Sequence, residues 1–310
     1  MAGNEPSTIQ WIQSLLEPGQ LLLYGLSYYI RVNLEAVFKK GQLLAPILQT
    51  GRLRDEAFGR FWIAFSSSRP DPKSESQSQS QPQHTPPPLA PPPQITCSSD
   101  LIPSILAHAS GLVLDVGPGT GTQLPLLRSP AIKTIYGAEP CLGLHDELRQ
   151  RARTEGLAEK YRVLGCSVAA EELVPALAKE GLPVEGGEGK DRGVFDSIIC
   201  VRVLCSVPNL NRTAKDLYSL LKPGGKLLVV EHVVNLWRSS KGSLVARIAQ
   251  AVYGLLGWSW FIGSCCLDRD TEAALREAAA ADGGWEVGDL DRHFGSGPLP
   301  YVSGVLVKRS

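Results

Sequence analysis

A short glycine-rich stretch carries the residues best suited to ligand chemistry. An apolar run over residues 113–116 contains Asp115, and Gly117, Gly119 and Gly121 then follow at every second position. This pattern predicts a buried strand, a tight turn and the start of a helix. Glycine lets the backbone approach a ligand where a Cβ would collide, and the first N–H groups of a helix favour negative charge. The stretch therefore predicts a ligand-binding turn, with a purely structural turn as the alternative.

A second acid closes the next predicted strand. Residues 133–138 form a β-rich run that ends on Glu139 and Pro140. An acid about 20 residues beyond a glycine turn is where nucleotide-binding sheets hold a ribose hydroxyl. The alternative is a solvated acidic turn residue. The spacing Gly-x-Gly-x-Gly is one residue shorter than the dinucleotide fingerprint, so the turn departs from that pattern.

Two cationic or titratable residues follow later strands. His232 stands after the β-rich run 227–231, and Arg202 stands after the run 194–201. A neutral imidazole could accept a proton near pH 7, although a histidine bonded only to backbone is the alternative. Arg202 could polarise a bound acceptor group or hold a bound carboxylate. These two residues are therefore the candidates for catalysis.

Three cysteines raise the question of a metal. Cys205 lies near the end of the fourth predicted strand, and Cys265 and Cys266 are adjacent. Neighbouring cysteines do not place both thiolates comfortably on one tetrahedral ion. We therefore expect buried structural cysteines and assign no metal ligand.

The elements around these residues alternate between β-rich and helical runs from residue 101 onward, which is typical of a doubly wound α/β sheet. The turn at 222–226, with proline and two glycines, ends a helix and opens a strand. Strands are predicted at 112–116, 133–138, 161–166, 194–201, 227–231, 285–290 and 301–308. Helices are predicted at 101–109, from 123, and at 144–157 and 271–281, with a surface loop at 182–193.

Four motifs in this order resemble class I S-adenosylmethionine-dependent methyltransferases of the type 11 group, over nearly all of residues 101–310. They are the turn at 115–121, Glu139, the strand start Phe195-Asp196, and residues 222–225. The resemblance implies a seven-stranded Rossmann-like sheet and S-adenosyl-L-methionine as cofactor. The cofactor-binding residues it implies are Asp115, Gly117, Pro118, Gly119, Thr120, Gly121, Glu139, Pro140, Ala170, Glu171, Val201 and Arg202.

The second half of the chain resembles a narrower group, the animal membrane-associated methyltransferases that act on alkyl thiols. The resemblance rests on residues 203–207, 231–233 and 263–267. It implies methylation of a small lipophilic thiol, at the endoplasmic reticulum or lipid droplets. Arg202 departs from the small polar residue expected there. O- or N-methylation remains an alternative, as does an inactive scaffold, against which the intact glycines and Glu139 argue.

Residues 244–261 lie between the fifth strand and the last helix. Leu244, Ile248, Val252 and Leu255 belong to an apolar stripe, and a tryptophan-rich end follows at 258–261. A helix at this place would cover the cofactor and line an apolar acceptor pocket. Core packing and membrane contact are the alternatives.

The N-terminal third differs from the remainder. Residues 1–65 form a predicted amphipathic helical extension, residues 66–99 a Ser/Pro/Gln-rich linker without a core, and residues 100–310 the catalytic domain. The apolar run within 7–65 is too short to span a bilayer. The extension could pack on the domain, or lie in the membrane interface through Trp11 and nearby tyrosines.

Charge and cysteine content narrow the partners and the compartment. The 31 basic and 31 acidic side chains cancel, so no global field favours nucleic acid. Seven cysteines without a Cys-x-x-Cys pair, and no leader at Met1, are typical of an intracellular protein in a reducing compartment. We therefore expect a cytoplasmic or peripherally membrane-associated enzyme with a small-molecule partner.

Overall fold

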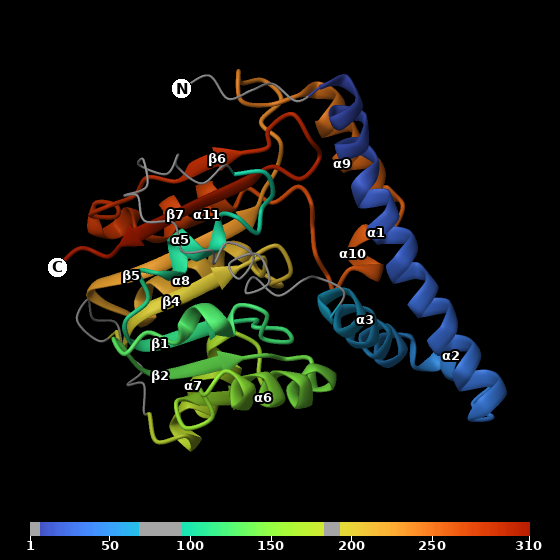
Figure 1. Cartoon of the computed structure of the whole chain (residues 1–310), viewed down its shortest axis with the longest axis horizontal. Helices are drawn as coiled ribbons and strands as arrows, with labels where there is room; N and C mark the ends of the chain where they lie inside the picture. Colours follow the sequence, from blue (N-terminus) through green and yellow to red (C-terminus); the bar gives the residue numbers. More distant parts are fainter. Residues whose placement is uncertain (1–6, 68–94, 183–192) are drawn as a thin grey trace, which may run out of the picture.

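The computed structural model describes residues 7–67, 95–182 and 193–310. Most of the predicted linker and of the predicted surface loop lies outside these ranges. A seven-stranded sheet forms the centre of the molecule, in the order β3-β2-β1-β4-β5-β7-β6 (Figure 1). The strands are β1 Gly111–Val116, β2 Ile132–Ala138, β3 Tyr161–Leu164, β4 Phe195–Val201, β5 Leu221–His232, β6 Asp291–His293 and β7 Tyr301–Val307. The α/β fold predicted from the sequence is confirmed.

The strand order reverses between β1 and β4, and this places the ligand-binding edge. Strands β1 to β5 pair in parallel, whereas β7 runs antiparallel to β5 and to β6. In such sheets, ligands bind at the carboxyl ends of the strands beside the reversal. The glycine turn follows β1, and Arg202 follows β4, so both stand at this point.

Two buried clusters hold the sheet between layers of helices. In β1, Leu114 and Val116 belong to one cluster and Val113 to the other. Because both faces are covered, the parallel strands read as continuous apolar runs. The first cluster includes side chains of α7, α8 and α11, and the second includes side chains of α5 and α6. The helices of this part are α5 Ile102–Leu106, η2 Leu124–Leu127, η3 Leu142–Leu144, α6 His145–Thr154, α7 Ala170–Lys179, α8 Leu210–Leu220, α9 Leu244–Leu255, α10 Trp258–Phe261, α11 Thr271–Ala278 and η4 Ala280–Asp282.

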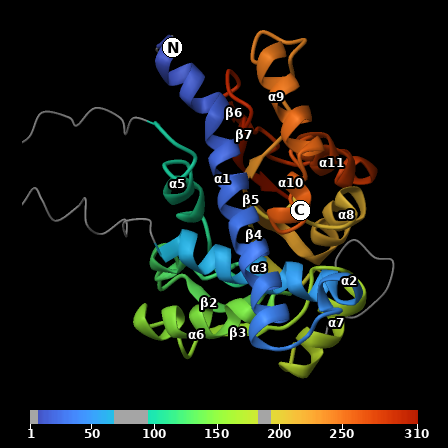
Figure 2. The same ribbon diagram turned by 90° about the vertical axis from the view of Figure 1, so that its right-hand side faces the viewer.

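The N-terminal residues form a further helical layer that packs on the domain (Figure 2). The Tyr253 hydroxyl of α9 donates to the Leu15 carbonyl at 2.8 Å, and Trp11 Nε1 donates to the Ser296 carbonyl at 3.0 Å. The layer consists of α1 Thr8–Leu34, η1 Glu35–Lys39, α2 Ala45–Leu48 and α3 Thr50–Ser67. In Figure 1 the arrowheads of β2 and β4 point toward this layer, so it lies across the carboxyl ends of the strands.

Within the three described ranges, no helix is both long enough and apolar enough to cross a membrane. The longest helix, α1, contains Pro18. Pro46 lies in the first turn of α2, where its missing N–H costs nothing. The preceding helix η1 ends at Lys39, and Gly41, whose φ is 66°, follows it.

Two predicted elements of the domain are wrong. No α-helix follows the glycine turn, which continues into the single 3-10 turn of η2 instead. Pro125 lies in the first turn of η2, where proline is tolerated, but Pro130 follows three residues after its end and disfavours the helical conformation at the residue before it. The predicted strand 285–290 is a single bridge between Val287 and Val307, and the short edge strand β6 begins at Asp291.

Candidate functional site

The glycine turn has the backbone that the sequence predicts. Gly117, Gly119 and Gly121 have φ angles of 58°, 61° and 76°, in the left-handed region that disfavours side chains. A Cβ on Gly117 would lie 2.4 Å from Val203 Cγ2, and one on Gly119 would lie 2.7 Å from Trp62 Nε1. Substitution at either position is therefore blocked by both conformation and space.

Glu139 is bound to the glycine turn. The Gly119 N–H donates to its Oε2 at 2.9 Å, and the Cys141 N–H donates to its Oε1 at 2.8 Å. Burial raises the pKa of Glu139, and these two hydrogen bonds partly offset that effect. Each carboxylate oxygen can accept more than one hydrogen bond, so Glu139 keeps acceptor capacity, and its binding to a ribose hydroxyl stays a prediction.

Asp115 has a partner that the sequence analysis did not identify. The Tyr161 hydroxyl of β3 donates to Asp115 Oδ2 at 2.8 Å, and both groups are buried. Burial raises the pKa of Asp115 to about 6, although the hydrogen bond from Tyr161 lowers it. Tyr161 is the first residue of β3, two strands away from β1 in the sheet, and nothing in the sequence indicates that it meets Asp115.

Helix α3 closes over the same turn. The Thr120 hydroxyl donates to Ser66 Oγ at 2.9 Å, and Trp62 stands beside Gly119. Pro118, Thr120 and the last two glycines of the turn are buried. The N-terminal extension therefore contributes side chains to the candidate cofactor site.

The structure does not gather all predicted cofactor residues around the turn. Pro140 is exposed after Glu139, and Ala170 begins α7. Glu171 is exposed and forms an ion pair with Arg212, which helps to hold its pKa below the usual value. The role of these residues stays a prediction.

Arg202 occupies a strained position directly after the buried Val201. Its φ is 57°, uncommon for a residue with a side chain. Its guanidinium donates to the hydroxyls of Ser98 and Ser99 at 2.8 and 3.0 Å, and Nε is buried without a partner in the described structure. Arg202 thus connects the last two residues of the predicted linker to the ligand-binding edge.

Glu231 and His232 are the last two residues of β5, and both are buried. The Val203 and Leu204 N–H groups donate to Glu231 Oε1 at 2.8 and 3.0 Å, which fixes the segment after β4. Burial raises the pKa of Glu231 to about 7. Glu231 Oε2 and His232 Nδ1 are buried and have no hydrogen-bond partner among the described residues. Unpaired buried polar atoms are costly, so they indicate a place where a ligand or water completes the site.

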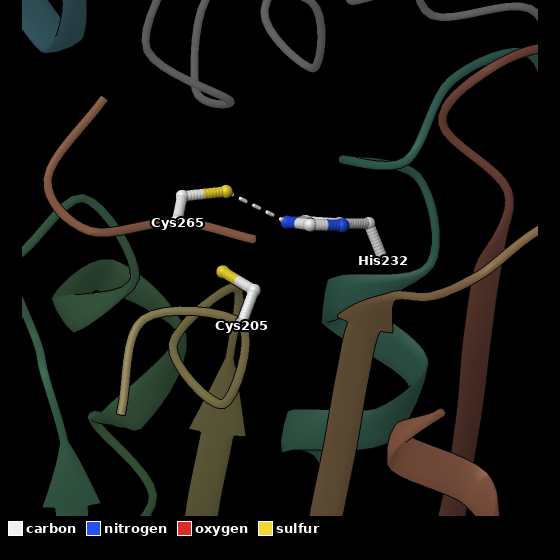
Figure 3. Close-up of side chains that lie close together, drawn as sticks. All are labelled: Cys205, His232 and Cys265. Carbon is white, nitrogen blue, oxygen red and sulfur yellow. Dashed lines mark hydrogen bonds between the residues drawn. The ribbon is translucent and has the colours of Figure 1, made fainter. Parts of the chain in front are cut away.

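Two cysteines join His232 at this edge (Figure 3). His232 Nε2 lies 3.1 Å from Cys265 Sγ, and Cys205 completes a buried group of three. Burial lowers the pKa of His232, but the Cys205 sulfur and other neighbours raise it, so the net shift is upward. The sequence analysis treated these residues separately because they lie on three distant segments.

The sequence predicts that α9 covers the acceptor side, but the structure shows that its apolar stripe faces solvent. Leu244, Ile248, Val252 and Leu255 are 53%, 55%, 45% and 88% exposed, so the stripe lines no pocket. The opposite face is anchored by the buried Gln250, whose amide donates to the Val233 and Leu267 carbonyls at 3.1 Å. This polar anchor decides which face of α9 turns inward.

The sheet order, the glycine turn and the acid after β2 define a Rossmann-like nucleotide-binding enzyme of the class I methyltransferase type. The family described as "Methyltransferase domain" matches residues 97–285, and the chain belongs to that family. The chain therefore carries an S-adenosylmethionine-dependent methyltransferase domain. Among the described residues, the buried polar atoms without partners at the ends of β4 and β5, in Arg202, Glu231 and His232, fit a cofactor lying across this edge.

Curated relatives match only parts of the chain. Thiol S-methyltransferase TMT1B of Homo sapiens is 29% identical over 175 residues, which cover 56% of this chain and 62% of that protein. The mitochondrial Methyltransferase OMS1 of Saccharomyces cerevisiae is 26% identical over 128 residues, 41% of this chain and 27% of that protein. The chain thus spans less than two thirds of each.

The chain is also similar to solved methyltransferase structures. An O-methyltransferase family protein from Burkholderia thailandensis aligns with a TM-score of 0.48 at 14% identity. The alignment covers 96% of this chain and 71% of that one.

Proposed function

We propose that this chain transfers a methyl group from S-adenosylmethionine to a small lipophilic thiol at the carboxyl ends of β4 and β5. The cofactor supplies a methyl group on a positively charged sulfur. The glycine turn, Glu139 and Asp115 would hold it, and the segment after β4 would face its reactive end. The protein would then act mainly by aligning donor and acceptor, which can contribute about 7–11 kcal/mol.

One observation carries this proposal. At the ends of β4 and β5, unpaired buried polar atoms lie beside an apolar and aromatic cluster contributed by several elements. An acceptor with an apolar body and one polar or thiol head would satisfy both surfaces. The buried members of the cluster are Leu22, Phe61, Cys205, Trp258, Ile262, Cys265 and Leu267.

Similarity to the human thiol S-methyltransferase favours a thiol over other acceptors. The surroundings of His232 are buried, apolar and sulfur-rich, which suits an acceptor that forms only weak hydrogen bonds, as a thiol does. Methylation of an oxygen or nitrogen acceptor is the competing proposal, and an inactive scaffold is the third.

The first prediction compares acceptors that differ only in the reacting atom. Full-length protein is incubated with radiolabelled S-adenosylmethionine and an alkyl thiol, alcohol or amine of equal chain length, or a phenol. We expect methylation of the thiol with the highest kcat/KM. Preference for the phenol or the amine would replace the thiol assignment, and no transfer to any acceptor would favour the scaffold.

We also propose that the N-terminal layer and α9 dock on a membrane surface from which a lipophilic acceptor is drawn. Large apolar side chains face solvent along α1, η1, α2 and α9, more than single scattered residues would account for. They include Ile9, Leu16, Leu23, Ile30, Phe38, Ile47, Leu48, Leu244, Ile248 and Leu255. Trp237 and Trp260, each beneath an arginine, supply the amphipathic aromatics typical of an interface.

The second prediction tests this surface without removing any element. Full-length protein should float with liposomes, and Phe38→Asp combined with Leu48→Asp should reduce that fraction severalfold, because charge opposes insertion. Val287→Asp is the control, since Val287 is 50% exposed but lies at the other end of the strands, where its partner Val307 pairs with Lys226 of β5. Equal flotation of both variants, or a wild-type protein that stays in solution, would contradict membrane docking at this surface.

A further inference from the structure

Three metal-binding side chains converge at the β4–β5 edge from segments far apart in the chain. Cys205 follows β4, His232 ends β5, and Cys265 follows α10 (Figure 3). Their exposed fractions are 2%, 5% and 7%. Among the described residues, their ligand atoms all lie within 4.8 Å of one another.

This spacing is close to what one tetrahedral ion requires. Zinc holds thiolate sulfur at about 2.3 Å and imidazole nitrogen at about 2.0–2.1 Å, so its ligand atoms lie about 3.5–3.8 Å apart. His232 Nε2 is already 3.1 Å from Cys265 Sγ. Side-chain adjustments of about 1 Å would bring all three atoms onto one ion.

The charge of the group suits a divalent ion in a buried place. Two thiolates and one neutral imidazole carry a charge of −2, which a divalent cation cancels, and burial favours such a neutral assembly. Thiolate and imidazole ligands together favour zinc over magnesium or calcium. The Trp258 indole N–H donates to Cys265 Sγ at 3.1 Å, which orients that sulfur as outer partners of metal ligands do.

The backbone on both sides of the group is held in uncommon conformations. Arg202 and Ser264 have φ angles of 57° and 63°, and they stand close before Cys205 and directly before Cys265. The Cys266 N–H donates to the Cys205 carbonyl at 2.9 Å, which joins the two cysteine segments. Strain of this kind persists where the surrounding structure enforces it, and it concentrates at functional sites.

We propose that Cys205, His232 and Cys265 bind one zinc ion and leave its fourth coordination position to the acceptor thiol. The second half of this proposal rests on the function proposed above. Three protein ligands with one open position are the arrangement of catalytic zinc sites, and a coordinated thiol loses its proton to solvent. His232 then serves as a ligand through Nε2, and the predicted role of proton acceptor is not needed.

Metal content tests the first half directly. Full-length protein purified under reducing conditions should contain one zinc per chain by elemental analysis. Cys205→Ser and Cys265→Ser should each lose that zinc, whereas Cys266→Ser should keep it, since the Cys266 sulfur contacts Ser264 and Arg269 instead. Absence of zinc from the wild type, another metal in its place, or equal loss in the Cys266 variant would overturn the site.

Cobalt substitution tests the metal site in the wild-type protein, without any variant. Wild-type protein reconstituted with Co²⁺ should show thiolate-to-cobalt charge-transfer absorption and tetrahedral ligand-field bands. An alkyl thiol should shift these bands, and the alcohol of equal chain length should not. Bands without a thiol-specific shift would refute the open position, and wild-type protein without bands would refute the site. Thiol methylation is measured separately, so a failure of the proposed function is distinguished from a failure of either half.

Discussion

The two halves of the ligand-binding edge differ in how completely their polar groups are paired. At the β1–β2 edge, Asp115 is bonded by Tyr161, and both oxygens of Glu139 accept backbone N–H groups. At the β4–β5 edge, Glu231 Oε2 and His232 Nδ1 are buried without partners in the described structure. One half is therefore preorganised for a constant ligand, and the other is completed by what binds there.

The largest expected effect comes from breaking the preorganised half. Gly119→Val places a side chain against Trp62 at a left-handed position, and it should abolish binding of S-adenosylhomocysteine. Calorimetry measures this. Gly156→Val is the control, because Gly156 has a φ of 71° but open space around its Cβ. Retained binding in the Gly119 variant would remove the turn from the cofactor site.

The second expected effect is a dependence of stability on pH at the same edge. The pKa of Asp115 is about 6 in the folded protein and 3.8 for an unperturbed carboxyl. The folded state therefore binds this proton more tightly, and the resulting stabilisation is fully present below pH 3.8 and lost as pH rises through 6. The contribution amounts to about 3 kcal/mol at most.

Unfolding of the cofactor-free protein by denaturant, measured across this pH range, isolates the effect. Asp115→Asn cannot titrate, so its free energy of unfolding should vary less with pH than that of the wild type. Identical pH profiles for the two proteins would show that Asp115 has an ordinary pKa.

The smallest effect separates two predicted cofactor carboxylates. Glu139→Ala removes a buried carboxylate bonded to the turn and should weaken S-adenosylhomocysteine binding by about 1.5–3 kcal/mol, about 10- to 150-fold. Glu171→Ala removes an exposed residue paired with Arg212 and should change binding by less than about 1 kcal/mol. A similar loss of S-adenosylhomocysteine binding in both variants would place Glu171 in the cofactor site. It would also contradict the distinction between the buried Glu139 and the exposed Glu171.

Local patterns were sufficient to predict most of the sheet and the glycine turn. The strands are apolar runs bounded by turns, and the positions of Gly117 and Gly119 demand a residue without Cβ. The predicted helix after the turn is only the four-residue η2, because Pro130 follows soon after the leucine-rich residues and disfavours further helix. The prediction of which face of α9 is buried was wrong. The buried Gln250 hydrogen-bonds to the domain, so the apolar stripe on the other face is exposed to solvent.

Contacts between distant segments could not be predicted in the same way. The Tyr161–Asp115 bond and the grouping of Cys205, His232 and Cys265 depend on how strands are ordered in the sheet. Sequence spacing indicates which residues lie on the same helix or strand. It does not indicate which helices and strands contact one another in the folded chain. Cys265 and Cys266 are adjacent in the sequence, but of these two only Cys265 lies in the group with Cys205 and His232.

The placement of α3 on the glycine turn also bears on how the protein unfolds. The family match begins at residue 97 and ends at residue 285, so it omits both α3 and β7. Yet Ser66 hydrogen-bonds to Thr120, and β7 pairs with β5 along residues 301–307. Removing either end would uncover apolar surface and unpaired backbone at the centre of the domain. The region that the family matches is therefore smaller than the part of the chain that unfolds cooperatively. The N-terminal extension and the domain should melt in a single transition.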